Sequence, residues 1–240
     1  MTISVVIPFQ SDPTQRHRPV RLADGASRED IFDWVFARWS DLCPEFDFVS
    51  ASSTSPIINR SQARNRAVAQ SSGDIIIIAD ADIVFHRRQI DMALQHIANG
   101  NQWVVGFNRY EQLTGPDTRT VLAQNPRSPV LRFPSPRWST DQGNAGLMVL
   151  TRHAFYEVGG YDERFSGYGW EDWAFANALS TLVHPLVTVP DFVLHLCHPR
   201  ASTRNSDKRK MKPLFDPYDD AMSNREAMRA IVDDPARRLT

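Results

Sequence analysis

The chain has 240 residues, a formal net charge of -1 and only two cysteines. This length is enough for one substantial hydrophobic core, whereas the near-neutral charge argues against bulk binding to nucleic acid or to an anionic membrane. Cys43 and Cys197 are too few for a disulfide framework and lack the CxxC spacing of a zinc site. No apolar run reaches the ~18 residues of a membrane span, and the N-terminal run lacks a basic lead-in. We therefore expect a cytoplasmic protein without a membrane span.

Strands and helices alternate in the first part of the chain. Short, β-branched apolar runs predict strands, and longer runs with apolar residues on one face predict helices. Ser27 stands where it can cap the first helix. The expected strands are 3–7, 46–51, the run beginning at Ile75, and 102–107; the expected helices are 27–42, 59–70 and 89–98. This alternation is typical of a parallel, Rossmann-like α/β sheet.

The second part of the chain is less regular. Residues 110–143 contain five prolines and are expected to be irregular, as a functional lid or a partly disordered segment. Beyond residue 200 the chain is polar; we expect a mobile segment at 202–212 and one amphipathic helix near 218–232. The remaining expected elements are strands at 147–150, 186–189 and 192–196, a helix capped by Thr151, and a helix that ends near Leu182.

Two aspartates follow the most apolar strand, in Ile75-Ile-Ile-Ile-Ala-Asp-Ala-Asp-Ile83. In open α/β sheets ligands bind beyond the carboxyl ends of the strands, where Asp80 and Asp82 are expected to lie. On an extended backbone both side chains point the same way, so together they can hold a hard divalent cation. The alternative is that Asp80 caps the next helix and Asp82 is a solvated turn residue.

A second acidic stretch is Gly167-Tyr-Gly-Trp-Glu-Asp-Trp173. The glycines allow a sharp bend, and the two acids then fall in the first turn of a helix, where the helix dipole favours carboxylates. Aromatic rings beside carboxylates suit a carbohydrate, and one carboxylate within reach of a hydroxyl can act as general base. An ordinary helix start with acidic residues is the alternative.

Two histidines end the last predicted strand, in His195-Leu-Cys-His198. Residues three apart on a strand face opposite sides, so we expect the two not to bind one metal together. One imidazole can nevertheless complete the site begun by Asp80 and Asp82, and His198 is better placed at the strand end. Each histidine has the alternative of a purely structural role.

These motifs, with three others, carry a resemblance to a known family. Asp80-Ala-Asp82 after a buried strand looks like the DxD motif of nucleotide-sugar glycosyltransferases with the GT-A fold. The nearest pattern is that of the β-1,4-galactosyltransferase and chondroitin-polymerase-like group, with the polypeptide N-acetylgalactosaminyltransferases as more distant cousins. The match covers about residues 3 to 200, and the motifs keep the family's order and spacing. The other matching motifs are Val6-Ile-Pro-Phe9, Asn59-Arg-Ser-Gln-Ala-Arg-Asn-Arg-Ala67, Gly159-Gly-Tyr-Asp-Glu163, Tyr168-Gly-Trp-Glu-Asp172 and His195-Leu-Cys-His198.

The resemblance implies a fold and a domain organisation. The fold would be a mostly parallel Rossmann-like sheet flanked by helices, with a smaller acceptor-side subregion. The glycosyltransferase domain would span residues 1–200, with a nucleotide-binding half (1–107) and an acceptor and catalytic half (108–200). Residues 201–240 would form a polar C-terminal extension, partly mobile and with one helix.

The resemblance also implies roles for individual residues. Asp82 and His198 would bind Mn²⁺ or Mg²⁺, with Asp80 near the metal or the ribose. Asp172 would be the catalytic base, and Glu171 would bind sugar hydroxyls. The implied donor-binding residues are Pro8, Phe9, Gln10, Arg60, Arg64, Asp80, Ala81, Asp82, Asn144, Ala145 and Gly146, and the implied acceptor-binding residues are Trp138, Tyr168, Gly169 and Trp170.

The expected activity is metal-dependent transfer of a sugar from a nucleotide-sugar, with a UDP-sugar favoured, to a hydroxyl of a glycan, a protein or a small molecule. An inverting reaction with a carboxylate base is expected; a retaining reaction on the same fold is an alternative. A nucleotidyltransferase is a further alternative, although residues 10–19 contain no glycine or lysine for a phosphate loop. The last alternative is a non-catalytic protein that binds sugar nucleotides. Gln10 stands where the family has arginine, so that contact to phosphate or uracil is left open. Trp173 stands where a third acid is common, so the identity of the sugar is left open.

Overall fold

A computed structural model describes most of the chain. The described residues are 1–11, 25–55, 58–128, 138–140, 146–167, 169–199 and 208–238. Three of the predicted site residues, Asn144, Ala145 and Tyr168, lie outside these ranges. For Trp138 the structure gives a place in a strand and does not describe the side chain.

The centre of the molecule is a five-stranded sheet in the described part of the chain, with the order β2-β1-β3-β8-β5. β1 pairs in parallel with both β2 and β3, whereas β8 lies antiparallel between β3 and β5. All of these strands except β8 therefore run in the same direction, which confirms the predicted mostly parallel α/β sheet. The strands are β1 (Ile3–Val6), β2 (Asp47–Val49), β3 (Ile75–Ala79), β5 (Trp103–Val105) and β8 (Leu147–Thr151).

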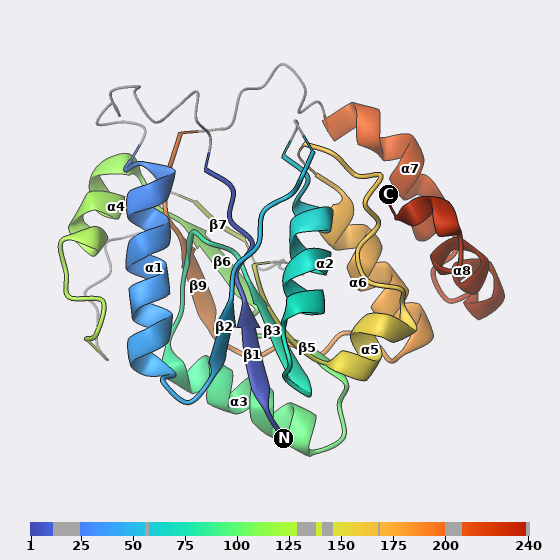
Figure 1. Cartoon of the computed structure of the whole chain (residues 1–240), viewed down its shortest axis with the longest axis horizontal. Coiled ribbons are helices and arrows are strands. Elements are labelled where there is room, and N and C mark those ends of the chain that lie inside the picture. Colours follow the sequence, from blue (N-terminus) through green and yellow to red (C-terminus); the bar gives the residue numbers. More distant parts are fainter. Residues whose placement is uncertain are drawn as a thin grey trace.

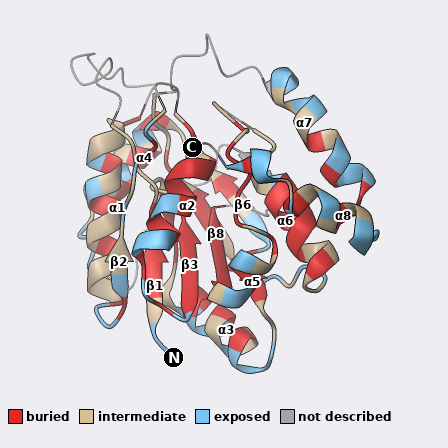
Figure 2. Ribbon diagram, turned by 45° about the vertical axis from the view of Figure 1, so that its right-hand side comes forward, coloured by how far each residue is buried: buried red, intermediate tan, exposed pale blue. Residues whose placement is uncertain are grey.

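β3 is the middle of this sheet and of the core. Each of its residues is buried, and Ile76 and Ile77 are 0% exposed. Figure 2 shows β1, β3 and β8 as a continuous buried band. A run of isoleucines fits this position because β-branched side chains pack well on both faces of a covered sheet.

Helices flank the sheet, with α1 on one side and α6 on the other (Figure 1). The predicted caps are present: the Ser27 side chain accepts a hydrogen bond from the Asp30 backbone N–H (3.0 Å), and the Thr151 side chain accepts one from the Ala154 N–H (3.1 Å). Asn59 also caps α2, by accepting from the Gln62 N–H (2.8 Å). These bonds satisfy donors that a helix start leaves unpaired. The helices are α1 (Arg28–Leu42), α2 (Arg60–Gln70), α3 (Arg87–Ala98), α5 (Arg152–Glu157) and α6 (Glu171–Leu182).

A smaller sheet follows the carboxyl end of β3 and has the order β4-β9-β6-β7. β4 begins directly after Asp82 and pairs antiparallel with β9, with Ile83 opposite His195. This pairing brings the end of the isoleucine segment next to the end of the last strand. The strands are β4 (Ile83–Val84), β6 (Arg109–Gln112), β7 (Trp138–Thr140) and β9 (Phe192–His195).

The prediction of an irregular segment over 110–143 is wrong for its described part, which contains β6, β7 and helix α4 (Gly115–Leu122). Thr114 caps α4 by accepting from the Asp117 N–H (3.3 Å), and Pro116 occupies the first turn, where a missing N–H costs little. The predicted strand at 186–189 is also wrong, because only Thr188 makes an isolated bridge, to Val105.

The C-terminal part has two helices where one was predicted. Helices α7 (Lys208–Asp220) and α8 (Arg225–Val232) both pack against α6, and a short 3-10 helix spans Pro235–Arg237 (Figure 1). Pro213 and Pro217 lie inside α7. Prolines normally interrupt a helix, which is why the sequence pattern concealed this one.

Within the described ranges, no helix combines the length and the apolar character that crossing a membrane requires. The cytoplasmic location stays a prediction.

We predict that Ile77→Ala lowers the free energy of unfolding by about 3–4 kcal/mol and Ile77→Val by about 1 kcal/mol, because both leave a cavity in the fully buried centre of the sheet. Met92→Ala, on the exposed face of α3 (39% exposed), should change it by less than about 0.5 kcal/mol. Urea unfolding followed by circular dichroism measures all three. A loss below about 1 kcal/mol for Ile77→Ala would show that β3 is not the centre of the core.

Candidate active site

Asp80, Ala81 and Asp82 form a turn between β3 and β4. The Asp80 backbone N–H donates to the carbonyl of Gly146 (2.9 Å), and the Ile83 N–H lies 3.4 Å from the Asp80 carbonyl. The inference that both aspartates point the same way from an extended backbone is therefore wrong. The turn directs them to two different groups of residues, which we call the histidine cluster and the arginine cluster.

The histidine cluster consists of Asp82, His195 and His198. Asp82 Oδ2 lies 2.9 Å from His198 Nε2 and 3.4 Å from His195 Nε2, and one ligand atom from each residue lies within 4.8 Å of the others. The expectation that the two histidines face opposite sides is wrong. β9 ends at His195, so the alternation of a strand does not extend to His198.

The charges of this cluster are strongly coupled. Burial alone would raise the pKa of the Asp82 carboxyl, but His195 and His198 hold that pKa well below its ordinary value. Burial likewise acts to lower the pKa of His195, and the neighbouring Asp82 carboxylate outweighs it, so that this pKa is raised. Asp82 Oδ1 is buried and has no hydrogen-bond partner among the described residues. A carboxylate with an unpartnered buried oxygen beside two imidazoles fits a divalent cation such as Mn²⁺.

The arginine cluster is centred on Arg64, which extends from α2 and is 1% exposed. Its Nη2 lies 2.8 Å from Asp80 Oδ1 and its Nη1 lies 2.7 Å from Asp172 Oδ1. The guanidinium also lies 4.8 Å from the ring centre of Tyr161. Arg64 was predicted to contact the donor; in the structure its terminal nitrogens bind the two carboxylates.

Glu171 and Arg60 complete the arginine cluster. Glu171 is 4% exposed, pairs with Arg60 Nη2 (2.8 Å) and accepts a hydrogen bond from the Gly169 N–H (3.1 Å). Three carboxylates thus face two arginines. Burial is the main reason that the pKa of Asp172 is raised to about 7; Arg64 lowers this pKa, and the charges of Glu171 and Asp80 raise it again. A carboxyl group with a pKa near neutrality is suited to general base catalysis.

The predicted nucleotide-binding residues Pro8, Phe9 and Gln10 come one residue after the end of β1. Because β1 and β3 are parallel neighbours, these residues leave the sheet at the same edge as Asp80. The Phe9 ring stacks on Phe32 (centroids 4.2 Å apart), and Gln10 Oε1 accepts a hydrogen bond from Ser53 (2.6 Å). The structure therefore brings this segment to the edge that carries the two clusters.

Among the predicted acceptor residues, Trp170 contacts the C-terminal part of the chain. Trp170 stacks on Phe215 of α7, with ring centroids 4.7 Å apart and an interplanar angle of 18°. Trp173, one turn further along α6, is 41% exposed. On sequence grounds, His195 was considered only as an alternative to His198 for the metal site, and no role was assigned to Tyr161 or Phe215. Tyr161 lies in the quoted Gly159–Glu163 motif, whereas nothing in the polar sequence around Phe215 pointed to the site.

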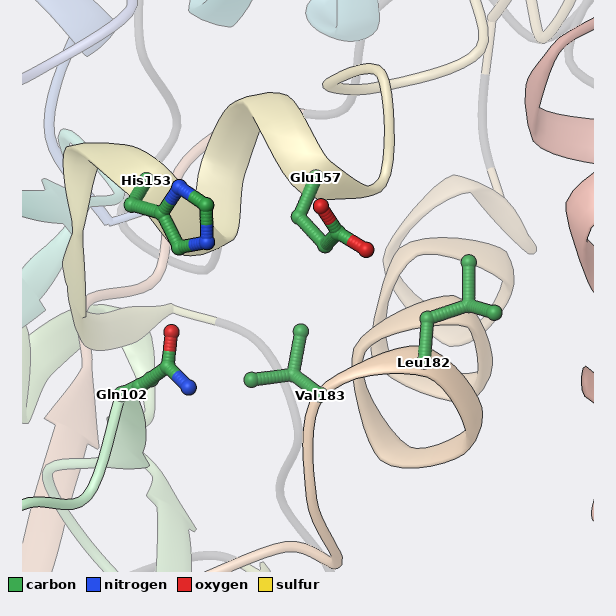
Figure 3. A pocket seen from close by; sticks show the side chains of 5 residues that line it. All are labelled: Gln102, His153, Glu157, Leu182 and Val183. Carbon is green, nitrogen blue, oxygen red and sulfur yellow. The ribbon is translucent and has the colours of Figure 1, made fainter.

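A pocket elsewhere on the surface contains none of the residues of the two clusters. Figure 3 shows His153 and Glu157 on α5 facing Gln102 and Val183 across it, with Leu182 beside them. The candidate active site is therefore defined by the side-chain clusters at the sheet edge.

Two family models match the sequence. Residues 59–159 match the model described as "Glycosyl transferase family 2", and residues 130–200 match "Glycosyltransferase like family 2". Together these ranges include the two clusters, since they contain Arg64, Asp82, Asp172 and both histidines. The chain is a glycosyltransferase with the GT-A fold. The sequence has no significant match among curated proteins.

Two solved glycosyltransferase structures agree with this chain in fold. The catalytic domain of Drosophila β1,4-galactosyltransferase 7 in complex with xylobiose has a TM-score of 0.52 at 13% identity, over 88% of this chain and 79% of that chain. Glucosyl-3-phosphoglycerate synthase from Mycobacterium tuberculosis in complex with Mn²⁺ and UDP-glucose has a TM-score of 0.51 at 15% identity, over 89% and 77%. Against a Drosophila β1,4-galactosyltransferase 7 mutant with manganese, UDP-galactose and xylobiose, the match covers 78% of this chain and 65% of that one, at 11% identity and a TM-score of 0.49.

We predict that Arg64→Met destabilises this glycosyltransferase by about 3 kcal/mol, because it leaves the Asp80 and Asp172 carboxylates without their shared partner. Arg87→Met is a matched control: Arg87 also pairs with two carboxylates, Glu45 and Asp91, but is 37% exposed, and its loss should cost no more than about 1 kcal/mol. Urea unfolding measures both. Equal losses would contradict a special role for the buried arginine.

Proposed function

We propose that this glycosyltransferase moves a sugar from a nucleotide-sugar, with a UDP-sugar favoured, to a hydroxyl of a glycan, a protein or a small molecule. The observation that carries the proposal is that one turn, Asp80 to Asp82, contributes a residue to each of the two clusters. Asp82 belongs to a cluster that fits a cation, while Asp80, two residues earlier, shares Arg64 with the candidate base Asp172. Donor activation and acceptor activation need such adjacent sites.

The histidine cluster forms the donor side of the proposed site. Asp82, His195 and His198 would hold Mn²⁺ or Mg²⁺, and a bound cation neutralises charge on a departing diphosphate. Support comes from the Mycobacterium tuberculosis neighbour, whose structure holds Mn²⁺ and UDP-glucose. The segment from Pro8 to Gln10 would line the nucleotide at the same sheet edge.

Asp172 is the better candidate for the base than Glu171. Glu171 is nearly fully buried and held by Arg60 and the Gly169 N–H, so it is poorly placed to accept a proton from a substrate. The Asp172 side chain is 16% exposed, and Arg64 contacts it through Oδ1. Its second oxygen, Oδ2, can therefore meet an acceptor hydroxyl. A single base that deprotonates the attacking hydroxyl supports an inverting displacement.

We predict that the chain binds UDP at least about tenfold more tightly with Mn²⁺ than without it, and that Asp82→Asn abolishes this increment. Isothermal titration calorimetry with UDP, with and without Mn²⁺, measures the effect. Asp91→Asn, which neutralises an exposed aspartate on α3, is the control and should retain the increment. An Asp82→Asn variant with unchanged metal dependence would refute the cation site.

We predict that kcat/KM for donor hydrolysis rises about tenfold per pH unit below about pH 7 and levels off above it. The raised pKa of Asp172 means that the carboxylate form, which accepts the proton, becomes dominant only as the pH passes about 7. Asp172→Asn should lower kcat by about 10²–10⁴-fold and leave the affinity for UDP with Mn²⁺ unchanged. A screen of UDP- and GDP-sugars with Mn²⁺ supplies the assay. A pH step that persists in Asp172→Asn would assign the base elsewhere.

A further inference from the structure

The helix that carries Asp172 begins at a residue with an unusual backbone. Trp170 is the N-cap of α6, has φ 73° and ψ -20°, and makes no side-chain cap hydrogen bond. Among the described residues only Trp170 and Ser223 combine a side chain with a positive φ. A Cβ makes this left-handed conformation unfavourable, and at a functional site it is kept only where the surroundings hold it.

Helix α7 supplies the group that holds Trp170. The Phe215 ring stacks on the Trp170 ring, and the Lys212 ammonium lies 5.9 Å from the centre of the same ring. Phe215 is 5% exposed, so the stack is packed and not a surface contact. The Trp170 carbonyl in turn accepts a hydrogen bond from the Ala174 N–H (2.9 Å), which starts the helical bonding of α6.

The loop before α6 is attached to the same C-terminal segment at its other end. Tyr218, one turn after Phe215, donates its hydroxyl to Asp162 Oδ2 (2.9 Å). The Glu163 N–H donates to the carbonyl of Arg237 (2.8 Å). The stretch from Asp162 to Trp170 is therefore fixed at both ends by residues 208–238. This segment lies beyond residue 200, where both family-model matches have ended.

We propose that α7 is a positioning element for the catalytic base, with Phe215 as the positioning residue that keeps Trp170 left-handed and so sets the first turn of α6. The inference rests on the proposed role of Asp172. If Trp170 relaxes to a right-handed conformation, the peptide that begins α6 rotates and Asp172 shifts relative to Arg64. A displacement of about 1 Å in a reacting group can cost about 100-fold in rate.

The first test compares Phe215→Ala with Met228→Ala. Both variants remove buried apolar surface from the C-terminal helices. Met228 is 0% exposed but lies on α8, whereas the ring that stacks on Trp170 comes from α7. Phe215→Ala should lower kcat for donor hydrolysis by about 10–100-fold with the affinity for UDP and Mn²⁺ within about twofold. Met228→Ala should lower the melting temperature by a similar amount and leave kcat within about twofold. Equal kcat values for the two variants would overturn the proposal.

The second test separates the backbone conformation from the stack. Trp170→Gly and Trp170→Ala both remove the ring, but only alanine retains a Cβ that opposes the left-handed conformation. We expect the glycine variant to keep about 5–10-fold more kcat than the alanine variant. Equal kcat values would show that the left-handed backbone of Trp170 does not determine the position of Asp172.

Amide hydrogen exchange in the full chain gives a readout that is independent of activity. Exchange of the Ala174 N–H, which bonds to the Trp170 carbonyl, should accelerate in Phe215→Ala and not in Met228→Ala. Unchanged exchange in Phe215→Ala would refute the role of α7. If the wild-type chain hydrolyses no nucleotide-sugar, the proposed function fails, whereas the exchange result still decides whether α7 holds the start of α6.

Discussion

The site depends on one buried, positively charged side chain, that of Arg64. Asp80, Glu171 and Asp172 come together at a sheet edge where all three are at least partly buried, and their mutual repulsion would raise the cost of folding. Arg64 offsets this repulsion by contacting Asp80 and Asp172 directly, with the face of Tyr161 beside its guanidinium. An arginine suits this position better than a lysine because its planar fork can serve two carboxylates and an aromatic ring at once.

The same helix also fixes the loop that leads to the base. Asn65 donates to the Tyr161 carbonyl (2.9 Å) and to Glu163 Oε1 (2.8 Å), and Asn59 donates to the Glu163 carbonyl (2.6 Å). Other buried polar side chains of α2 have partners elsewhere: Gln62 Oε1 accepts a hydrogen bond from the Thr54 N–H (2.8 Å), and Arg64 pairs with Asp80 and Asp172. A polar face inside a protein is stable when its groups are paired, and the partners of Asn59 and Asn65 lie in the loop from Tyr161 onward.

Much of the fold followed from local sequence signals. The strand formed by the isoleucines of β3, the caps Ser27 and Thr151 and the acids at the start of α6 were predicted because each depends on nearby residues and on a simple period. The family resemblance supplied the GT-A fold, which the structure confirms. The candidate base and the assignment of Asp82 and His198 to one cluster also came from that resemblance.

The errors arose where tertiary structure overrides a local rule. A turn separates Asp80 from Asp82, and the strand ends before His198, so neither pair obeys the alternation of extended backbone. The prolines of α7 concealed a helix that is held by packing on α6. No local sequence pattern predicts that Phe215 stacks on Trp170, because that contact exists only in the folded chain.

The contacts of the site span the chain, which has a consequence for how the domain folds. Arg64 and Asp172 are 108 residues apart, and Asp82 and His198 are 116 apart. Closing loops of this length is entropically costly and is repaid only when the intervening core has formed. Catalytic geometry should therefore be a late product of folding. Neither the first 107 residues nor the following part up to residue 200 contains both partners of these pairs, so an isolated half would have no working site.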